Sequence, residues 1–278
     1  MEKDTLVIGG GGIRGFAMMG ILHEMDKCVD LRKMKNIIGT SVGSILGYLI
    51  CFMKPDEIFD KTKNMDILSE SNIDVTKMFS EYGIIKFEIL ETFLMNMTKQ
   101  YFEKESITFK ELNKKTGKDL RITGTNISKK QGEIFSKKTT PDMNIIDAIK
   151  ISTCIPYLFT KMVYNGDYYV DGSLTNGYPW KEFKVSNKRK IGIRAIMTDC
   201  DRNEYNIIEY MSDIISTIVN ITDNTKECKI DTIEVSTKCN IVEEHDRKMI
   251  ENLYNEGKII GKEFMLRLSL DKQGRRMY

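Results

Sequence analysis

The chain has 278 residues, of which 41% are hydrophobic and 29% are charged, an ordinary composition for a soluble globular protein that argues against intrinsic disorder. Forty-two Lys and Arg against 40 Asp and Glu leave a net charge of only +2. The basic pairs are scattered along the chain, which argues against a dedicated nucleic-acid binder.

The cysteines and the apolar stretches indicate where the protein resides. The six cysteines form no CxxC pair and are too dilute for a disulfide framework, so we expect reduced thiols inside a cell. The first glycine run comes almost at once, which leaves no room for a secretion signal. The longest apolar stretch, 45–53, falls well short of the roughly twenty residues that span a bilayer. We therefore expect a soluble cytoplasmic protein with peripheral, transient membrane contact.

The first elements repeat a strand–turn–helix pattern. An apolar run at Thr5–Ile8 stops at four glycines, and a helix-like segment follows from about residue 16 to 25. Residues 36–38 run into a second glycine-rich turn, and an apolar helix follows over 44–53 until Pro55 ends it. Two such units in succession predict a parallel sheet with crossover helices.

The middle of the chain mixes helices and strands. Apolar residues recur at helical spacing between 87 and 101, which predicts a helix packed on the sheet, with a lid over a site as the alternative. Strands are predicted at 120–124 and 133–136, and a short helix at 145–152. Asn165-Gly166 stands between two alternating apolar runs, which predicts a β-hairpin.

The last part of the chain continues the alternation. A strand is predicted at 191–197, a helix with one apolar face at 207–219, a strand at 233–236 and a long helix at about 244–268. We find neither an internal repeat nor a low-complexity linker. The sequence therefore predicts a single domain over residues 1–278.

Gly39-Thr40-Ser41-Val42-Gly43 fits the GxSxG nucleophile elbow, in which a serine sits on a strained strand-to-helix turn and glycines allow close packing around it. The predicted strand before it and the apolar helix after it are the context that the elbow requires. The amino terminus of that helix would also stabilise negative charge near Ser41. We therefore predict that Ser41 is a nucleophile, with a plain strand–helix turn as the alternative.

The glycine run over residues 9–15 also satisfies GxGxxG after a strand, a pattern typical of dinucleotide-binding turns. Such a turn expects an acidic residue after the next strand, about twenty residues further on, whereas residues 37–38 lead into the glycine and serine of the elbow. The alternative is that glycine N–H groups converge on the oxyanion formed when Ser41 attacks a carbonyl. Arg14 would add positive charge nearby.

A serine nucleophile needs a base, and histidine is the usual one. The chain has two: His23 follows the glycine run on a predicted helix, and His245 lies among acidic residues at the start of another. Asp171 is better placed, because the second hairpin strand ends at it and would display its carboxylate. From chemistry alone Asp171 could equally be a turn residue, which is how we interpret Asp167.

Three of these elements, in this order, resemble the patatin-like phospholipase family: a GGGxRG loop, a GxSxG elbow and a late DG[GA] turn, here Asp171-Gly172-Ser173. Residues 107–112 look like the family's TFxEL segment, and residues 145–159 look like its helix ending in SxxIPxxF. The resemblance extends from about Leu6 to Pro179, and the joint spacing is more specific than any single motif.

The resemblance implies a fold and a site. The fold is a patatin-type three-layer α/β sandwich with a central mainly parallel sheet, whose core spans about 6–180 and is completed by the elements of 190–268. The site is a dyad of Ser41 as nucleophile and Asp171 as general base, without histidine, cofactor or metal. Gly10, Gly11 and Gly12 would supply oxyanion donors, and Arg14 would support that loop or the substrate's phosphate.

Two positions depart from the family pattern. Ser173 stands where glycine or alanine is usual, which leaves the aspartate intact but affects the geometry of its turn. Gly9 replaces an aspartate that often precedes the glycines, a substitution the family tolerates.

The expected function is a calcium-independent lipid acyl hydrolase that cleaves phospholipid or other glycerolipid esters through an acyl-enzyme. Three alternatives stay open at this point. They are a standard α/β hydrolase using Ser41 and His245, a transacylase that passes the acyl group to a lipid acceptor, and a non-catalytic lipid- or nucleotide-binding domain.

Overall fold

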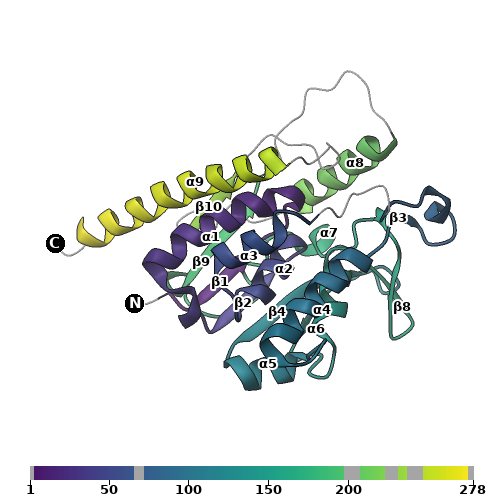
Figure 1. Cartoon of the computed structure of the whole chain (residues 1–278), viewed down its shortest axis with the longest axis horizontal. Helices are drawn as coiled ribbons and strands as arrows, with labels where there is room; N and C mark the ends of the chain where they lie inside the picture. Colours follow the sequence, from purple (N-terminus) through teal and green to yellow (C-terminus); the bar gives the residue numbers. More distant parts are fainter. Residues whose placement is uncertain (1–2, 66–71, 197–206, 223–230, 237–246, 275–278) are drawn as a thin grey trace.

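A computed structural model describes residues 3–65, 72–196, 207–222, 231–236 and 247–274 (Figure 1). At its centre is a mostly parallel sheet whose parallel part has the strand order β10-β9-β1-β2-β4. These strands are β1 (Thr5–Ile8), β2 (Asn36–Gly39), β4 (Asp119–Asn126), β9 (Lys190–Ala195) and β10 (Thr232–Val235).

An antiparallel extension grows from the long strand β4. It contains β5 (Gln131–Ser136) and the hairpin of β7 (Met162–Tyr164) and β8 (Asp167–Val170), with both β5 and β8 antiparallel to β4. The hairpin turn has φ of +50° at Asn165 and +83° at Gly166. Positive φ at both central residues is the turn geometry that an Asn-Gly pair favours, so this predicted hairpin is confirmed.

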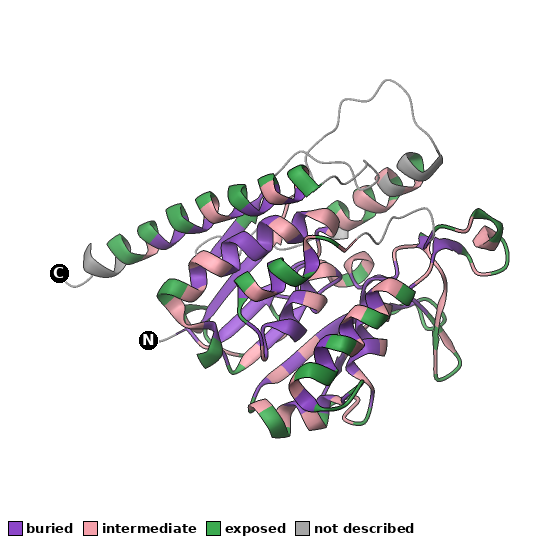
Figure 2. Ribbon diagram, viewed as in Figure 1, coloured by how far each residue is buried: buried purple, intermediate pink, exposed green. Residues whose placement is uncertain are grey.

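Most of the helices cover one face of the sheet. The helices are α1 (Gly15–Val29), α2 (Val42–Leu49), α3 (Pro55–Thr62), α4 (Glu88–Phe102), α5 (Phe109–Thr116), α6 (Ile145–Ser152), α8 (Ile207–Thr222) and α9 (Arg247–Gly274), with the single-turn α7 (Ser173–Asn176) after β8. Helix α8 instead contacts α7 and the short strand β6 (Tyr157–Phe159). Figure 2 shows the buried residues concentrated in the central strands and in the helix faces turned toward them. The expectation of an α/β fold with a central mainly parallel sheet is thus confirmed.

The two sheet faces are covered differently. Leu6 and Ile8 of β1 belong to the large core under the helices, whereas Val7 faces the other side. There it packs, with Ile38, against a second apolar cluster that includes Tyr178, Trp180 and Phe183. An irregular aromatic segment after α7 therefore closes the sheet face opposite the helices.

The helix after the elbow is shorter than expected. We predicted helix over 44–53 with Pro55 as its stop, but α2 ends at Leu49 and Pro55 is the first residue of α3. Proline suits a first helical position because its fixed φ is preorganised there and the missing N–H would be unpaired anyway. The proline therefore starts a helix rather than merely ending one.

The apolar stripe of α4 is buried in the core, with Leu90 and Leu94 almost fully inaccessible. The helix is thus packed rather than a lid, but it packs against α6, not directly on the sheet as predicted. The TFxEL-like segment begins α5: the Thr108 hydroxyl accepts from the Glu111 N–H, and the Glu111 carboxylate accepts from the Thr108 N–H. This reciprocal capping box explains the spacing of the two residues.

The long helix α9 lies along α1, as Figure 1 shows. The two helices approach through glycines, since a side chain at Gly20 would overlap the Tyr254 carbonyl and one at Gly257 would overlap the Ala17 carbonyl. The helix runs to Gly274, beyond the expected end near residue 268, and its predicted start at 244–246 lies outside the described residues.

Candidate active site

Ser41 lies between β2 and α2, on the turn that the elbow motif predicts. Its φ is +54° and its ψ is −128°, a backbone conformation that L-residues rarely adopt. The flanking glycines make the turn possible: a side chain at Gly43 would overlap the Ile8 carbonyl, and one at Gly39 would overlap the Gly43 carbonyl. The turn places the serine side chain at the carboxyl end of the sheet, where it borders the cavities described below.

Asp171 stands directly beside this serine. The Ser41 hydroxyl donates to Asp171 Oδ2 at 2.7 Å, although the residues are 130 positions apart. Both are buried, with exposed fractions of 6% and 2%. The hairpin strand β8 ends immediately before Asp171, as the sequence predicted.

The backbone and carboxylate of Asp171 are held on several sides. Its N–H donates to the Cys154 carbonyl at 2.8 Å, and its own carbonyl accepts from the Thr125 hydroxyl at 2.8 Å. The Ser173 N–H donates to Oδ1 at 2.7 Å, so Oδ2 is left facing Ser41. The carboxylate is therefore fixed in one orientation before any substrate arrives.

Burial raises the pKa of Asp171 to about 6, since desolvation penalises the charged carboxylate. Hydrogen bonds from Ser173 and from the Ser41 hydroxyl oppose this effect and lower the pKa. A carboxylate with such a pKa is a stronger base than an exposed aspartate, yet is still ionised near neutral pH.

A second serine supports the elbow from α6. The Ser41 N–H donates to the hydroxyl of Ser152, which is completely buried, at 2.9 Å. The Ser44 hydroxyl in turn donates to the Ser41 carbonyl at 2.6 Å. We did not predict a role for Ser152 from the sequence, where its only signal was its place in the motif-like segment over 145–159.

The glycine loop passes next to Ser41. Gly10 donates its N–H to the Gly177 carbonyl at 3.0 Å, so this amide is already paired, in contrast to the donor role we expected for it. Gly12 has a φ of +53°. Within the described residues, the N–H groups of Gly11, Gly12 and Val42 have no protein acceptor. All three residues line cavities that reach Ser41.

Arg14 is placed differently from a substrate-binding arginine. It is only 3% exposed and lines neither cavity at Ser41. Its N–H donates to the Gly11 carbonyl at 3.1 Å. We expected Arg14 either to support the glycine loop or to contact the substrate's phosphate, and its buried position favours the first role.

His23, the histidine that the structure describes, does not compete with Asp171. His23 lies on α1, where its ring packs edge-on against Tyr254 and its Nε2 is 3.8 Å from Glu24 Oε1. It lines neither cavity. His245 lies outside the described residues.

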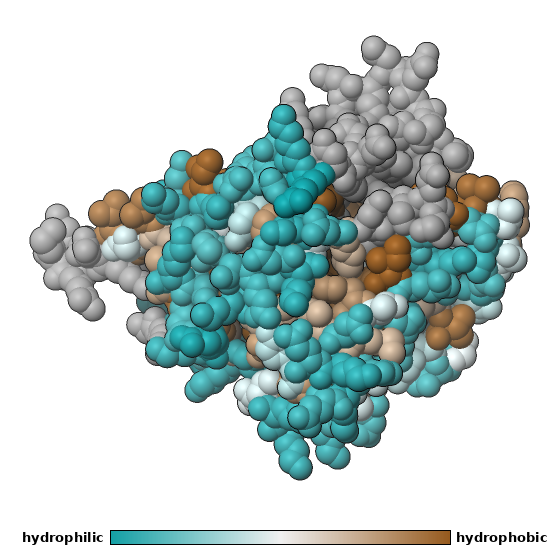
Figure 3. Space-filling view, in the orientation of Figure 1, coloured by the Kyte–Doolittle hydropathy of each residue, from teal (hydrophilic) through white to brown (hydrophobic). Residues whose placement is uncertain are grey.

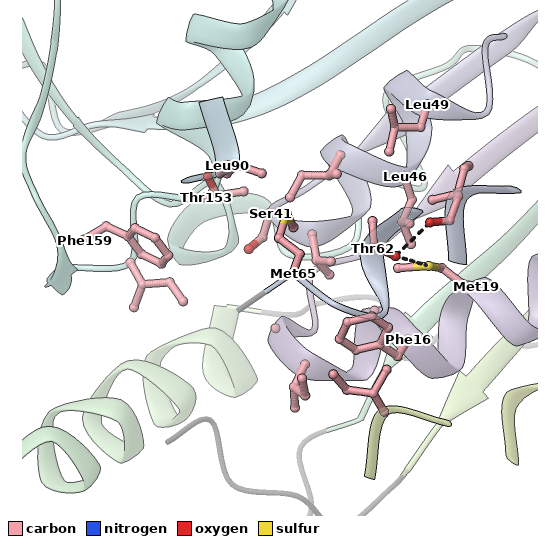
Figure 4. Close-up of a pocket in the computed structure, with 18 of the residues that line it drawn as sticks. Phe16, Met19, Ser41, Leu46, Leu49, Thr62, Met65, Leu90, Thr153 and Phe159 are labelled. Atoms are coloured by element: carbon pink, nitrogen blue, oxygen red, sulfur yellow. Dashed lines mark hydrogen bonds between the residues drawn. The ribbon is translucent and has the colours of Figure 1, made fainter. Parts of the chain in front are cut away.

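An apolar cavity of about 180 Å³ opens from Ser41 between the helices (Figure 4). In Figure 4, Ser41 lies near the centre of the view, with Phe159 on one side and Phe16 and Met19 on the other. Its wall is almost entirely hydrocarbon and includes Phe16, Met19, Leu46, Leu90, Ile155 and Phe159. This is the chemistry that a fatty-acyl chain requires.

A smaller cavity of about 70 Å³ meets the first at Ser41. The glycine loop, Asp171 and Ser173 form one wall, and α8 and Arg194 of β9 form another. The guanidinium of Arg194 pairs with Glu234 on the adjacent strand β10 at 3.0 Å. Ser41 thus stands where an apolar cavity joins a more polar one.

Metal-binding clusters and membrane-spanning helices are both missing from the described part of the chain. Within it, no group of three or more His, Cys, Asp or Glu side chains is arranged to hold a metal ion. Among the helices described, none combines the length and the apolar character needed to cross a bilayer.

Comparison with known proteins identifies relatives of the chain. The sequence profile of the patatin-like phospholipase family matches residues 6–184. The chain is 35% identical over 196 residues to the probable lipid hydrolase 463L of Invertebrate iridescent virus 6, covering 67% of this chain and 66% of that protein. It is 30% identical over 194 residues to the uncharacterized protein R571 of Acanthamoeba polyphaga mimivirus, covering 68% and 64%. The chain thus matches slightly less than two thirds of the length of these relatives.

Solved structures share the fold at low sequence identity. VipD from Legionella pneumophila superposes with a TM-score of 0.59 at 15% identity, covering 95% of this chain and 67% of that one. ExoU from Pseudomonas aeruginosa, in complex with SpcU, gives a TM-score of 0.53 at 15% identity, covering 96% and 53%. At this identity the comparison establishes the architecture alone.

Proposed function

The chain belongs to the patatin-like phospholipase family of lipid hydrolases, and we propose that it cleaves fatty-acyl esters of phospholipids or other glycerolipids with a dyad of Ser41 and Asp171. The observation that carries the proposal is the 2.7 Å hydrogen bond between the strained serine and a fixed, buried carboxylate. The apolar cavity that begins at the same serine supports a fatty-acyl substrate.

In the first step Asp171 accepts the hydroxyl proton as Ser41 Oγ attacks the ester carbonyl. The carbonyl oxygen becomes an oxyanion and needs donors that are already oriented. The N–H groups of Gly11 and Gly12 are suited to this role because they are unpaired within the described protein and border Ser41. The Val42 N–H, at the amino terminus of α2, is a third candidate.

In the second step the protonated carboxyl donates to the leaving alcohol oxygen, which leaves an acyl-enzyme on Ser41. Asp171 then takes a proton from water, which attacks the acyl carbonyl, releases the fatty acid and restores the serine. The apolar cavity would hold the acyl chain throughout. Protein groups carry every step of this scheme, so we expect chelation of calcium to leave the rate unchanged.

Covalent labelling by a fluorophosphonate tests the nucleophile. We expect the wild type to label and Ser41→Ala not to label. Ser44→Ala is a matched control, because it removes a neighbouring buried hydroxyl that bonds only the Ser41 backbone. Equal labelling of wild type and Ser41→Ala would refute the proposed nucleophile.

The base is tested by a pair of matched substitutions. Asp171→Asn should abolish turnover of a short-chain soluble ester, whereas Asp167→Asn should retain it. Asp167 lies on the same hairpin but pairs with Lys129 at 2.5 Å, away from the serine. A standard Ser-His hydrolase would give the opposite pattern, with His245→Ala inactive and Asp171→Asn active.

Product analysis distinguishes hydrolysis from transfer. With a phospholipid substrate, release of free fatty acid supports the hydrolase. Appearance of the acyl group on an added lysophospholipid or monoacylglycerol, with little free acid, would show a transacylase using the same acyl-enzyme.

A further inference from the structure

The helix α8 exposes apolar side chains on the side that faces away from the site. Its inner side, with Ile215 and Val219, lines the smaller cavity at Ser41. On its outer side Tyr210, Ile214, Ile218 and Ile221 are exposed, and Ile221 is 73% exposed. These four recur at the three- and four-residue spacing of one helical stripe. A surface helix usually turns such a stripe toward the core.

A projecting loop carries a second set of exposed apolar side chains. The loop runs from η4 (Val75–Met78) to β3 (Gly83–Ile85), and β3 pairs with β6 (Tyr157–Phe159). Phe79 at its tip is 91% exposed, and Val75 and Tyr82 are also exposed. Large hydrophobic side chains are seldom so accessible without a partner.

The loop is anchored to the wall of the apolar cavity. Ile84 and Ile85 pack in a small core with Leu158, whose side chain also lines that cavity. The Lys161 ammonium donates to the Ser80 carbonyl at 2.8 Å and lies 5.1 Å from the centre of the Tyr82 ring. The tip therefore presents Phe79 on a supported backbone.

The two sets lie on one side of the molecule. β6 contacts both β3 and α8, and its Tyr157 is exposed between them. Figure 1 places α8 and the β3 loop at the same end, and Figure 3 shows brown side chains at that end, near the β3 loop. We call the α8 stripe, the loop residues and Tyr157 the apolar rim. Of these elements, β6 lines the apolar cavity through Leu158 and Phe159, and α8 lines the smaller one through Ile215 and Val219.

We propose that the apolar rim inserts into the surface of a lipid layer and sets the cavity openings against the acyl chains. This proposal rests on the proposed function, because a lipid layer would both cover the rim and supply the lipid substrate. A protein partner or a second copy covering the same elements would instead close the approach to Ser41. The rim thus fits a lipid surface better than either.

The charges of the rim define the kind of surface. The loop carries Lys77 and Glu81, with Asp74 and Lys86 at its two ends, while α8 carries the acidic Glu209 and Asp213 and no Lys or Arg. Without a net positive charge, attraction to anionic head groups adds little. Binding should therefore arise from apolar insertion, be no stronger on anionic than on neutral vesicles and persist at high salt.

Vesicle sedimentation of the full chain tests the rim. The Ser41→Ala background prevents hydrolysis, and the vesicles are phosphatidylcholine with and without phosphatidylserine. Phe79→Glu and Ile221→Glu should each lower the partition coefficient by about tenfold or more, because each removes an inserted apolar side chain and adds a charge. Ile259→Glu is the matched control: Ile259 is 62% exposed on α9, outside the rim, and its replacement should not change partitioning.

Two companion measurements separate this proposal from the proposed function. In the Ser41-containing protein, Phe79→Glu should hydrolyse a soluble short-chain ester at the wild-type rate while losing hydrolysis of vesicle lipid. Phe79→Trp should retain binding, and the fluorescence of the introduced indole should shift to the blue when vesicles are added.

Three results would refute the insertion of the rim into a lipid layer. They are absence of wild-type binding to either vesicle, equal partitioning of Phe79→Glu and Ile259→Glu, and a shift from dimer to monomer in Ile221→Glu by light scattering. If the wild type did not hydrolyse a soluble ester, the proposed function would be refuted instead.

Discussion

Replacing Asp171 by asparagine should make the protein inactive and, above about pH 6, more stable. Asparagine has nearly the shape of the carboxyl and can still accept from the Ser173 N–H, but it cannot take the Ser41 proton. Loss of a general base that acts with its nucleophile as a unit lowers kcat/KM by roughly 10⁴-fold, or about 5.5 kcal/mol of transition-state stabilisation.

The gain in stability follows from the raised pKa. An aspartate has an ordinary pKa of 3.8, and one that titrates at about 6 when folded is costly to ionise in the native state. The protonated Asp171 adds to the free energy of unfolding in full below the pKa that it has in the unfolded chain. This contribution is lost as the pH rises through the pKa that Asp171 has in the folded protein. A difference of about 2 between the folded and unfolded pKa values corresponds to roughly 3 kcal/mol. The neutral amide avoids this cost, although the weakened bond to Ser41 offsets part of it.

Denaturant unfolding of wild type and Asp171→Asn across a pH series measures the effect. The variant should be more stable above about pH 6, and the difference should shrink as pH falls toward 4. Asp167→Asn should show no such gain, since the pKa of Asp167 is lowered by its hydrogen bond to Lys129. A variant that is less stable than wild type at every pH would refute the account of Asp171 as a buried, desolvated base.

Three further predictions concern the surroundings of the dyad and the fold. Ser173→Gly removes a hydroxyl that lowers the pKa of Asp171, so the acidic limb of kcat/KM against pH should move to higher pH. Gly10→Ala should shift the acidic limb in the same direction, because the new methyl would overlap the Ser173 hydroxyl. Because both changes act on that hydroxyl, the shift in the Gly10→Ala/Ser173→Gly double variant should be smaller than the sum of the two single shifts. Thr108→Ala breaks the capping box of α5 and should cost about 1 kcal/mol in urea unfolding while leaving soluble-ester kinetics unchanged.

Local patterns predicted the parts of the site that local geometry creates. The strand before Ser41, its turn and the following helix are set by glycines within a few residues, and the hairpin before Asp171 is set by Asn165-Gly166. Both are short-range features with known backbone requirements. Their meeting could not be read from either segment, and only the combined spacing of the family motifs suggested it.

Long-range contacts escaped prediction. Ser152 bonds to the Ser41 N–H from another helix, and Gly177 takes the N–H of Gly10, although nothing in either local sequence marks these pairings. The aromatic cover around Trp180 is likewise a product of tertiary packing. Patterns of period two and 3.6 report which side of an element is buried but not which partner buries it.

The place of β1 between β2 and β9 determines the order in which this protein can assemble on the ribosome. β2 follows β1 closely, but Ile8 also pairs with Ile193, and α1 packs against α9 near the end of the chain. β1 therefore leaves the exit tunnel long before β9, and its second edge stays unpaired until β9 has been synthesised. In nascent chains arrested before β9 emerges, protease should accordingly cut readily at β1, although β1 is fully buried in the folded protein.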